Sequence, residues 1–243
     1  MAEAQQGPRA RYREQTRAEI KEAALRQLAD GGVAALALTR IAKDMGLSGP
    51  ALYRYFANRD DLLNALIRDA YDDAATAMGV AAARSEAAGH GPRERLRSLA
   101  TAYRAWAIGE PHRYLLIQGS PVPGYVAPAD TLERARAVLG PFLPVFAGGV
   151  PGAGVAPVVA QMAAWLGSES ESAVGDWVAE YAADVTGDPA ASARALAGAV
   201  LAWAQLHGSV GLEAAGQFAG MGHDGDVLLA AQTDMLADAF ALG

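Results

Sequence analysis

A short stretch of the chain gathers side chains that can bind phosphates and base edges. Tyr53, Arg54 and Tyr55 follow one another, and Arg40 and Arg59 stand on either side of them. Tyrosine hydroxyls can donate to phosphate oxygens, and a guanidinium can pair with a phosphate or with the two acceptors on the major-groove edge of guanine. This set of residue types predicts contact with double-stranded DNA.

The residues before this set predict a short helix followed by a tight turn. Thr39 can cap the helix, and Ile41 and Met45 recur at helical spacing behind it. Gly46 then supplies the left-handed backbone that ends a helix at no steric cost. We therefore expect the first helix of the motif to end at Gly46.

A second short helix should carry the DNA-contacting side chains. Ser48 can cap it, and Pro50 falls in its first turn, where the missing N–H is not needed. Leu52 and Phe56 are four residues apart and should face inward, so that Tyr53 and Arg54 face outward. A helix with such an outer face fits the major groove.

Residues 38–63 resemble the helix-turn-helix of the tetracycline-repressor (TetR) family of bacterial transcription regulators. The resemblance implies that the recognition helix meets the bases, that two tyrosine hydroxyls anchor phosphates, and that a basic residue opens the next helix. Tyr55 departs from the pattern, since many members have histidine there, but it keeps the hydrogen bond. The DNA-binding residues so implied are Thr39, Arg40, Ser48, Gly49, Pro50, Ala51, Tyr53, Arg54, Tyr55 and Arg59.

The charge distribution agrees with a DNA-binding N-terminal part. Through Arg59 the chain has ten Lys and Arg against six Asp and Glu, whereas the whole chain has a net charge of −7. Phosphate neutralisation depends on local and not on net charge. The chain has no cysteine and no leader-like segment at its start, which predicts a cytoplasmic protein without disulfides or thiolate metal sites.

Two other classes of protein compete with a DNA-binding regulator. One is a small-molecule-binding helical protein or enzyme whose helix-turn-helix is only structural, and the other is an adaptor whose helix-turn-helix binds protein. The sequence contains no nucleophile elbow, phosphate-binding loop or metalloprotease helix, and the glycine-rich stretch 149–154 follows no strand. Its histidines are scattered. We therefore predict no enzymatic activity and no resident cofactor or metal.

The rest of the sequence predicts helices throughout. No run alternates polar and apolar residues, so the expected class is all-α: a three-helix DNA-binding domain over residues 1–63, disordered over 1–11, and a larger helical domain over 64–243. The uncharged stretch 137–168 is broken by prolines well short of the ~20 apolar residues of a membrane span. It is predicted to be a buried helix-loop-helix, and no membrane association is expected.

The C-terminal part resembles, more loosely, the regulatory domain of the TetR subgroup marked by a Trp-His-Gly signature. The matching segments are 111–114, 121–125 and 203–208. The resemblance implies a small-molecule pocket between helices and a homodimer formed by the last long helices. Residues 189–210 carry only Arg194 as a charge, so they must be covered by a second copy or by the chain's own helices. A palindromic operator also requires two recognition helices about 34 Å apart.

The predicted regulator is a repressor that a small-molecule effector releases from its operator by spreading the two DNA-binding heads. Large aromatic and polarisable side chains are the candidates for its effector pocket, although the same residue types build ordinary cores. The candidates are Tyr103, Trp106, Tyr114, Met162, Trp165, Trp177, Tyr181 and His207.

Overall fold

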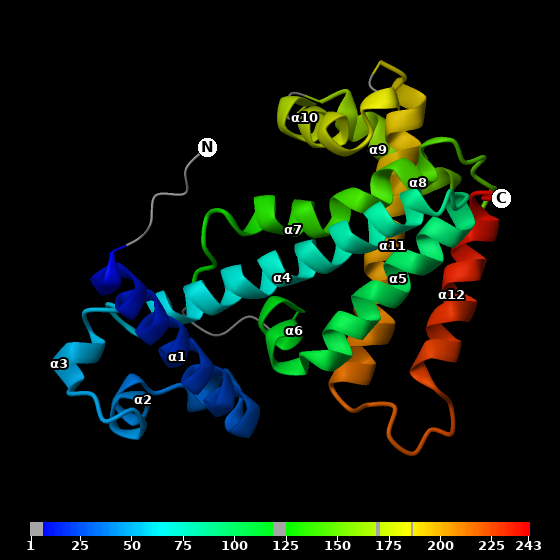
Figure 1. Cartoon of the computed structure of the whole chain (residues 1–243). Helices are drawn as coiled ribbons and strands as arrows, with labels where there is room; N and C mark the ends of the chain where they lie inside the picture. The colour runs from blue at the N-terminus through cyan, green and yellow to red at the C-terminus, as the bar shows by residue number, and fades with distance from the viewer. Residues whose placement is uncertain (1–6, 119–124, 169–170, 186) are drawn as a thin grey trace. The chain divides into compact units, whose positions relative to one another are not determined.

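The computed structural model describes residues 7–118, 125–168, 171–185 and 187–243. Within these ranges the chain is helical and contains no strand, which confirms the all-α class (Figure 1). Two compact units are formed. The first comprises the described residues up to Asp69 with those of 119–128, and the second comprises 70–118 with those of 129–243. The division falls inside one continuous helix, a few residues after the predicted boundary at residue 63.

The first unit is built from three helices and the start of a fourth around one apolar core. Ile20, Ile41, Phe56 and Leu62 are fully buried in it. Its elements are α1 (Pro8–Gly31), the 3₁₀ turn η1 (Val33–Ala35), α2 (Leu38–Asp44), α3 (Gly49–Leu52) and the first part of α4 (Arg59–Ala87).

Most of the predicted local signals act as expected in this unit. Gly46 has φ +65° and follows the end of α2. The Ser48 hydroxyl accepts from the Ala51 N–H at 3.3 Å, and Pro50 stands in the first turn of α3. The Asn58 side chain accepts from the Asp61 N–H at 2.8 Å and so caps α4. These turns therefore follow from chemistry within a few residues.

Two details of the prediction are wrong. Thr39 does not cap α2, because the helix already begins at Leu38; the Ala37 N–H at this helix start is bound instead by the side chain of Gln27 at 2.9 Å. Residues 8–11 are not disordered but form the first turn of α1, which Pro8 opens without needing a free N–H. Residues 1–6 lie outside the described part of the chain.

The second unit contains the remaining helices, most of them packed around α11. Helix α11 contacts α5, α6, α8, α9 and α12, and Figure 1 shows α5 and α12 alongside it. The elements are α5 (Pro92–Gly109), α6 (Pro111–Gln118), α7 (Thr131–Leu139), η2 (Gly140–Phe142), α8 (Leu143–Ala147), α9 (Ala156–Leu166), α10 (Glu171–Tyr181), η3 (Ala183–Val185), α11 (Pro189–Ala214) and α12 (Gly225–Ala239).

Helix α11 has a glycine, Gly198, where it packs against α8 in this core. A Cβ on Gly198 would lie 2.0 Å from the Phe146 ring, so only glycine allows α8 and α11 to approach as they do. Phe146 is fully buried and its ring centroid lies 5.0 Å from that of Phe240. The chain's own helices thus cover most of α11, which was one of the two predicted possibilities.

Helix α11 is also the one described helix long and apolar enough to cross a membrane by length and composition. Because 56% of its apolar window is buried inside the protein, it has the character of a core helix.

The uncharged stretch 137–168 is only partly buried, contrary to the prediction. Phe142, Leu143 and Phe146 are fully buried, but α9 has no buried residue. The reason lies in the tertiary structure. Among the described elements α9 packs mainly on α11 and α10, which leaves much of its surface exposed.

Candidate nucleic-acid interface

The turn after α2 presents the predicted DNA-contacting residues at the surface of the first unit. Only residues 49–52 form α-helix, and the chain continues through a turn to Phe56. Leu52 and Phe56 are buried, whereas Tyr53 is 49% exposed and Arg54 is exposed. The predicted inward and outward faces of this recognition segment, residues 48–56, are therefore both present.

The guanidinium of Arg54 and the hydroxyls of Tyr53 and Tyr55 make no hydrogen bond or ion pair with any described residue. Thr39 is also exposed, and among the described residues the guanidinium of Arg40 pairs only with Asp30, in an exposed ion pair of 3.7 Å. Such a surface ion pair contributes little to stability and leaves the arginine available. Ser48 and Pro50 are exposed beside them, and Gly49 and Ala51 are half-buried.

Arg59 stands apart from this group because its donors are used inside the unit. Its Nη2 donates to the Val33 carbonyl at 2.6 Å and its Nε donates to the Leu36 carbonyl at 3.2 Å. These bonds join the start of α4 to the segment around η1. The phosphate contact that the family resemblance implies for Arg59 stays a prediction, and it would have to be made by the remaining N–H groups.

Arg17 supports the recognition segment, and the sequence reasoning missed this role. Its Nη1 donates to the Tyr55 carbonyl at 2.7 Å, and its guanidinium lies 4.1 Å from the centroid of the Phe56 ring. The contact joins α1 to residues 38 positions further along the chain. No local motif signals such a pairing, so only the fold reveals it.

The effector candidates do not form one group. Tyr103, Trp106, Tyr114 and His207 meet in one ring cluster, and Trp203, which was not among the candidates, completes it. Tyr103 is central, with ring centroids 5.7–6.1 Å from the others. Met162 and Trp165 lie on α9, and Trp177 and Tyr181 lie on α10. Residues 121–124, part of the resemblance, lie outside the described residues.

The ring cluster is electrically neutral and largely buried. Burial lowers the pKa of His207 to about 4, and burial raises the pKa values of Tyr103 and Tyr114. The Tyr114 hydroxyl lies 3.4 Å from Nδ1 of His207. The indole N–H of Trp106 is buried and finds no acceptor within the described chain. A buried donor without a partner is costly, and a bound ligand could supply the acceptor.

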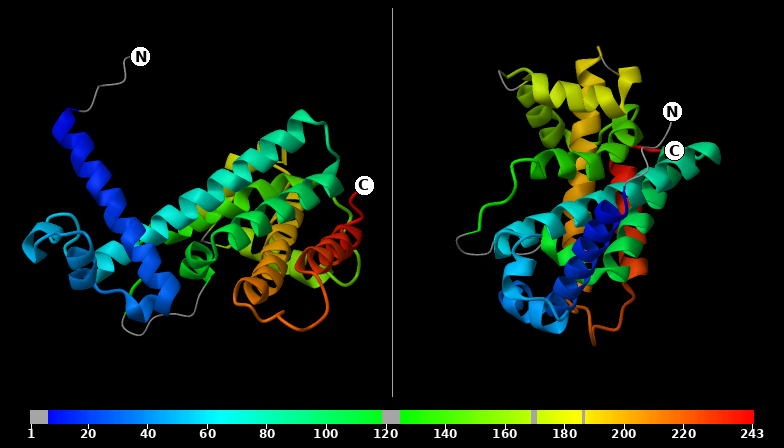
Figure 2. Two further views of the ribbon diagram at one scale, coloured as in Figure 1. Left: turned by 60° about the horizontal axis from the view of Figure 1, so that its bottom comes forward. Right: turned by 60° about the vertical axis from the view of Figure 1, so that its left-hand side comes forward.

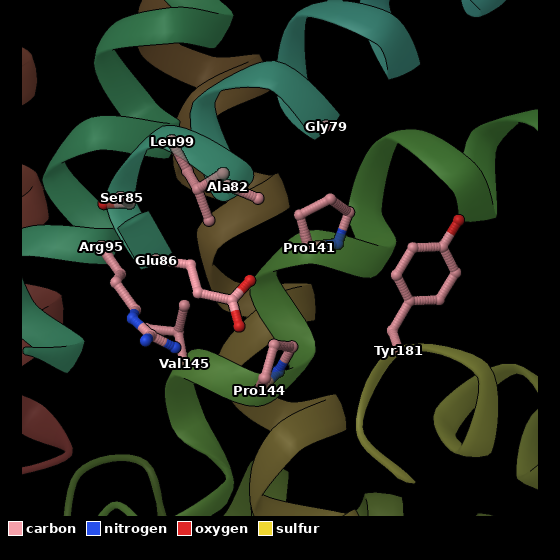
Figure 3. Close-up of a pocket in the computed structure, with 10 residues that line it drawn as sticks. All are labelled: Gly79, Ala82, Ser85, Glu86, Arg95, Leu99, Pro141, Pro144, Val145 and Tyr181. Atoms are coloured by element: carbon pink, nitrogen blue, oxygen red, sulfur yellow. The ribbon is translucent and has the colours of Figure 1, made fainter. Parts of the chain in front are cut away.

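A separate cavity of about 340 Å³ lies within the second unit. Its walls are largely apolar, with Leu99, Val145 and two prolines among them. Figure 3 shows Glu86 and Arg95 on one side of this cavity and Tyr181 on the other, with Pro141 and Pro144 between them. Of the predicted effector residues, only Tyr181 lines this cavity.

Comparison with known proteins agrees with this architecture. Residues 20–66 match the family model described as bacterial regulatory proteins, tetR family, and residues 96–236 match the model described as tetracyclin repressor-like, C-terminal domain. The HTH-type transcriptional regulator Rv1816 of Mycobacterium tuberculosis is 35% identical over 97% of this chain and 96% of its own length. The regulator Mb1846 of Mycobacterium bovis matches equally.

Solved structures share the fold as well. The crystal structure of the regulatory protein SCO4313 is 42% identical, with a TM-score of 0.74 over 96% of this chain and 100% of that one. FadR from Bacillus subtilis, crystallised with stearoyl-CoA, is 13% identical with a TM-score of 0.55 over 91% of this chain and 98% of its own. The second likeness concerns the fold alone.

Proposed function

Because the chain belongs to the TetR family of bacterial transcription regulators, we propose that it is a homodimeric repressor released from a palindromic operator by a small-molecule effector. The observation that carries this proposal is the recognition segment, where Tyr53 and Arg54 face outward with unused donors. Their exposure next to a well-capped turn suits a segment that enters the major groove. The protein would act in the cytoplasm, where bacterial DNA is accessible.

Selection of genomic DNA fragments on the purified protein tests the proposal directly. We expect enrichment of one inverted repeat, with affinity that falls steeply as salt rises. Arg54→Ala should weaken discrimination at one or two base positions by ~1–3 kcal/mol each, whereas Tyr53→Phe should weaken binding to all sequences alike. Failure to enrich any fragment at any salt concentration would contradict a DNA-binding function, and identical behaviour of the two variants would remove base reading from Arg54.

The proposed homodimer rests on an uncharged stripe along the last two helices. On α11 the exposed residues Val200, Ala204, Gly208 and Leu212 recur every four positions. On α12, Val227 and Met235 are 63% and 68% exposed. An uncharged stripe suits a two-fold interface, in which the same patch of both copies meets itself. Light scattering should give twice the monomer mass, and Leu212→Asp should reduce it to that of a monomer.

The proposed effector site is the ring cluster. FadR, which has a similar fold, was crystallised with stearoyl-CoA, and this supports a small-molecule site in the present chain. The cluster offers aromatic walls, two tyrosine hydroxyls and the unpaired Trp106 N–H. A tenfold loss of operator affinity requires that the effector bind the released form more tightly by ~1.4 kcal/mol. An effector that binds there should change the tryptophan fluorescence and release the operator, and Trp106→Phe should weaken both effects.

The alternative function is a small-molecule-binding protein or enzyme in which the helix-turn-helix is only structural. Its support is the 340 Å³ cavity, which is large enough for a small ligand. No group of three or more His, Asp or Glu side chains among the described residues is placed to hold a metal ion. The absence of operator binding, together with ligand binding that Leu99→Trp abolishes, would favour this alternative.

A further inference from the structure

The first two turns of α1 project from the first unit without any packing role. Every residue from Pro8 to Gln15 is exposed, and Thr16 is the first buried one. In Figure 1 and in the left view of Figure 2 these turns extend beyond α2 and α3 of the same unit. A helical projection that buries nothing needs another reason for its order.

The projection carries charges that weaken a helix. Arg9 and Arg13 are four residues apart, and Arg17 follows at the same spacing, so the three guanidinium groups share one face. Like charges at this spacing repel, and cations near a helix N-terminus oppose the helix dipole. The first turn contains no acidic residue to offset them. A sequence that breaks helix rules twice in two turns indicates a functional surface.

The row of arginines starts beside the recognition segment. Arg17 is fixed there by its bond to the Tyr55 carbonyl and by the Phe56 ring. Arg9 and Arg13 are exposed, and their guanidinium groups make no hydrogen bond or ion pair with any described residue. At a rise of 1.5 Å per residue, Arg9 lies about 12 Å and Arg13 about 6 Å from Arg17 along the helix axis. The longer of these distances corresponds to roughly three base-pair steps of a DNA duplex.

We propose that Arg9 and Arg13 bind the phosphate backbone of the DNA that flanks the bases met by the recognition segment. This inference rests on the proposed function and extends the DNA-binding surface from α3 to the first turns of α1. The partner is the polyanionic backbone of a duplex, which guanidinium groups bind through charge-assisted hydrogen bonds. The contact carries no base preference and sets affinity and salt dependence.

The test compares two full-length double variants that lose the same charge. The first is Arg9→Gln with Arg13→Gln. The control is Arg26→Gln with Arg84→Gln, because both side chains are exposed and neither guanidinium makes a hydrogen bond or ion pair within the described chain. Arg26 lies nine residues after Arg17, which places it on the opposite face of α1. Operator affinity is measured over a range of salt concentrations on a long duplex and on one trimmed at both flanks.

On the long duplex, the first variant should lower the slope of log affinity against log salt by about 2 for each protomer, since each phosphate contact contributes about 0.9. Its affinity should fall equally for the operator and for scrambled duplexes, and the difference from the unmodified protein should shrink on the trimmed duplex. The control should keep the original slope. The variant should unfold no more easily than the control, because it loses a repulsion.

Three outcomes would overturn the inference. Equal slopes for the two variants would show that Arg9 and Arg13 touch no phosphate. An altered base preference would show that they read a groove. A variant that unfolds at a lower temperature than the control would show a structural role. If the unmodified protein binds no duplex at all, the proposed function itself fails, and that result is distinct from these three.

Discussion

The recognition segment and the ring cluster both carry aromatic and polar side chains, but they hold them in opposite environments. Tyr53 and Arg54 are exposed with their donors unused, whereas Tyr103 and Tyr114 are fully buried among other rings. The first surface can meet DNA without rearrangement. Because Tyr103 and Tyr114 are fully buried, a ligand that contacts their rings must displace neighbouring side chains, so an effector there would bind an altered form of the second unit.

The prediction with the largest expected effect concerns the tight packing of the second unit. Gly198→Ala would place a Cβ 2.0 Å from the buried Phe146 ring, which cannot move because Phe240 lies against it. We expect a loss of roughly 1–3 kcal/mol or more in the free energy of unfolding. All four tryptophans lie between residues 106 and 203, so their fluorescence in a urea titration reports on this unit.

Gly79→Ala on α4 is the matched control, since a Cβ there meets nothing within 4 Å. It should unfold at a urea concentration no lower than that of the unmodified protein. If Gly198→Ala behaves in the same way as Gly79→Ala, the core around α11 is looser than the structure indicates.

A second prediction distinguishes the two units by the pH dependence of their free energy of unfolding. Burial lowers the pKa of His207 to about 4, below the ordinary value of 6.5, so the folded protein holds this ring neutral. As pH falls from about 6.5 towards 4, the unfolded chain takes up a proton that the folded one refuses, and stability falls by up to roughly 3 kcal/mol. The first 69 residues contain no histidine. Tryptophan-detected unfolding between these pH values measures the loss.

His207→Gln identifies the source of this pH dependence. The variant should lose less stability than the unmodified protein over the same range, while His112→Gln, at an exposed position, should leave the dependence unchanged. If the free energy of unfolding of His207→Gln falls with pH as steeply as that of the unmodified protein, the loss of stability arises from other groups.

The two units also differ in how far the sequence predicted them. Gly46, Ser48 and Asn58 act on backbone groups within three or four residues, so their roles could be inferred from spacing alone. The exposure of α9 could not be inferred from spacing, because it depends on which helices pack around α11. Arg17 shows the same limit inside the first unit, since its partner Tyr55 is far away in sequence.

The effector candidates illustrate the limit most clearly. Residue type selected eight side chains, and the fold brings four of them together and adds Trp203. Periodicity shows which residues share a helix face, but it does not show which faces of separate helices meet.

A prediction with a smaller expected effect concerns the N-cap of α4 in the first unit. Asn58→Ala should remove the cap on α4 at the Asp61 N–H, while the bond from the Ala57 N–H to the Asp61 carboxylate can persist. Loss of an N-cap costs about 1 kcal/mol. Because the first unit has no tryptophan, unfolding followed by circular dichroism should shift while the fluorescence transition stays in place. Asn58→Asp keeps a capping oxygen and should restore the transition.

The prediction with the smallest expected effect distinguishes a glycine that packs inside the chain from one that lies in the proposed dimer interface. Gly208 lies on α11 like Gly198, but a Cβ there meets nothing within 4 Å. Glycine inside a helix costs up to about 1 kcal/mol relative to alanine, so Gly208→Ala should stabilise the dissociated chain by about that amount. The same substitution should weaken the dimer, because the added methyl group projects from the proposed interface stripe. Unfolding at low protein concentration and sedimentation equilibrium measure the two effects. Stabilisation without weaker association would show that the partner helix does not pass close to Gly208, and it would move the dimer contact away from the centre of that stripe.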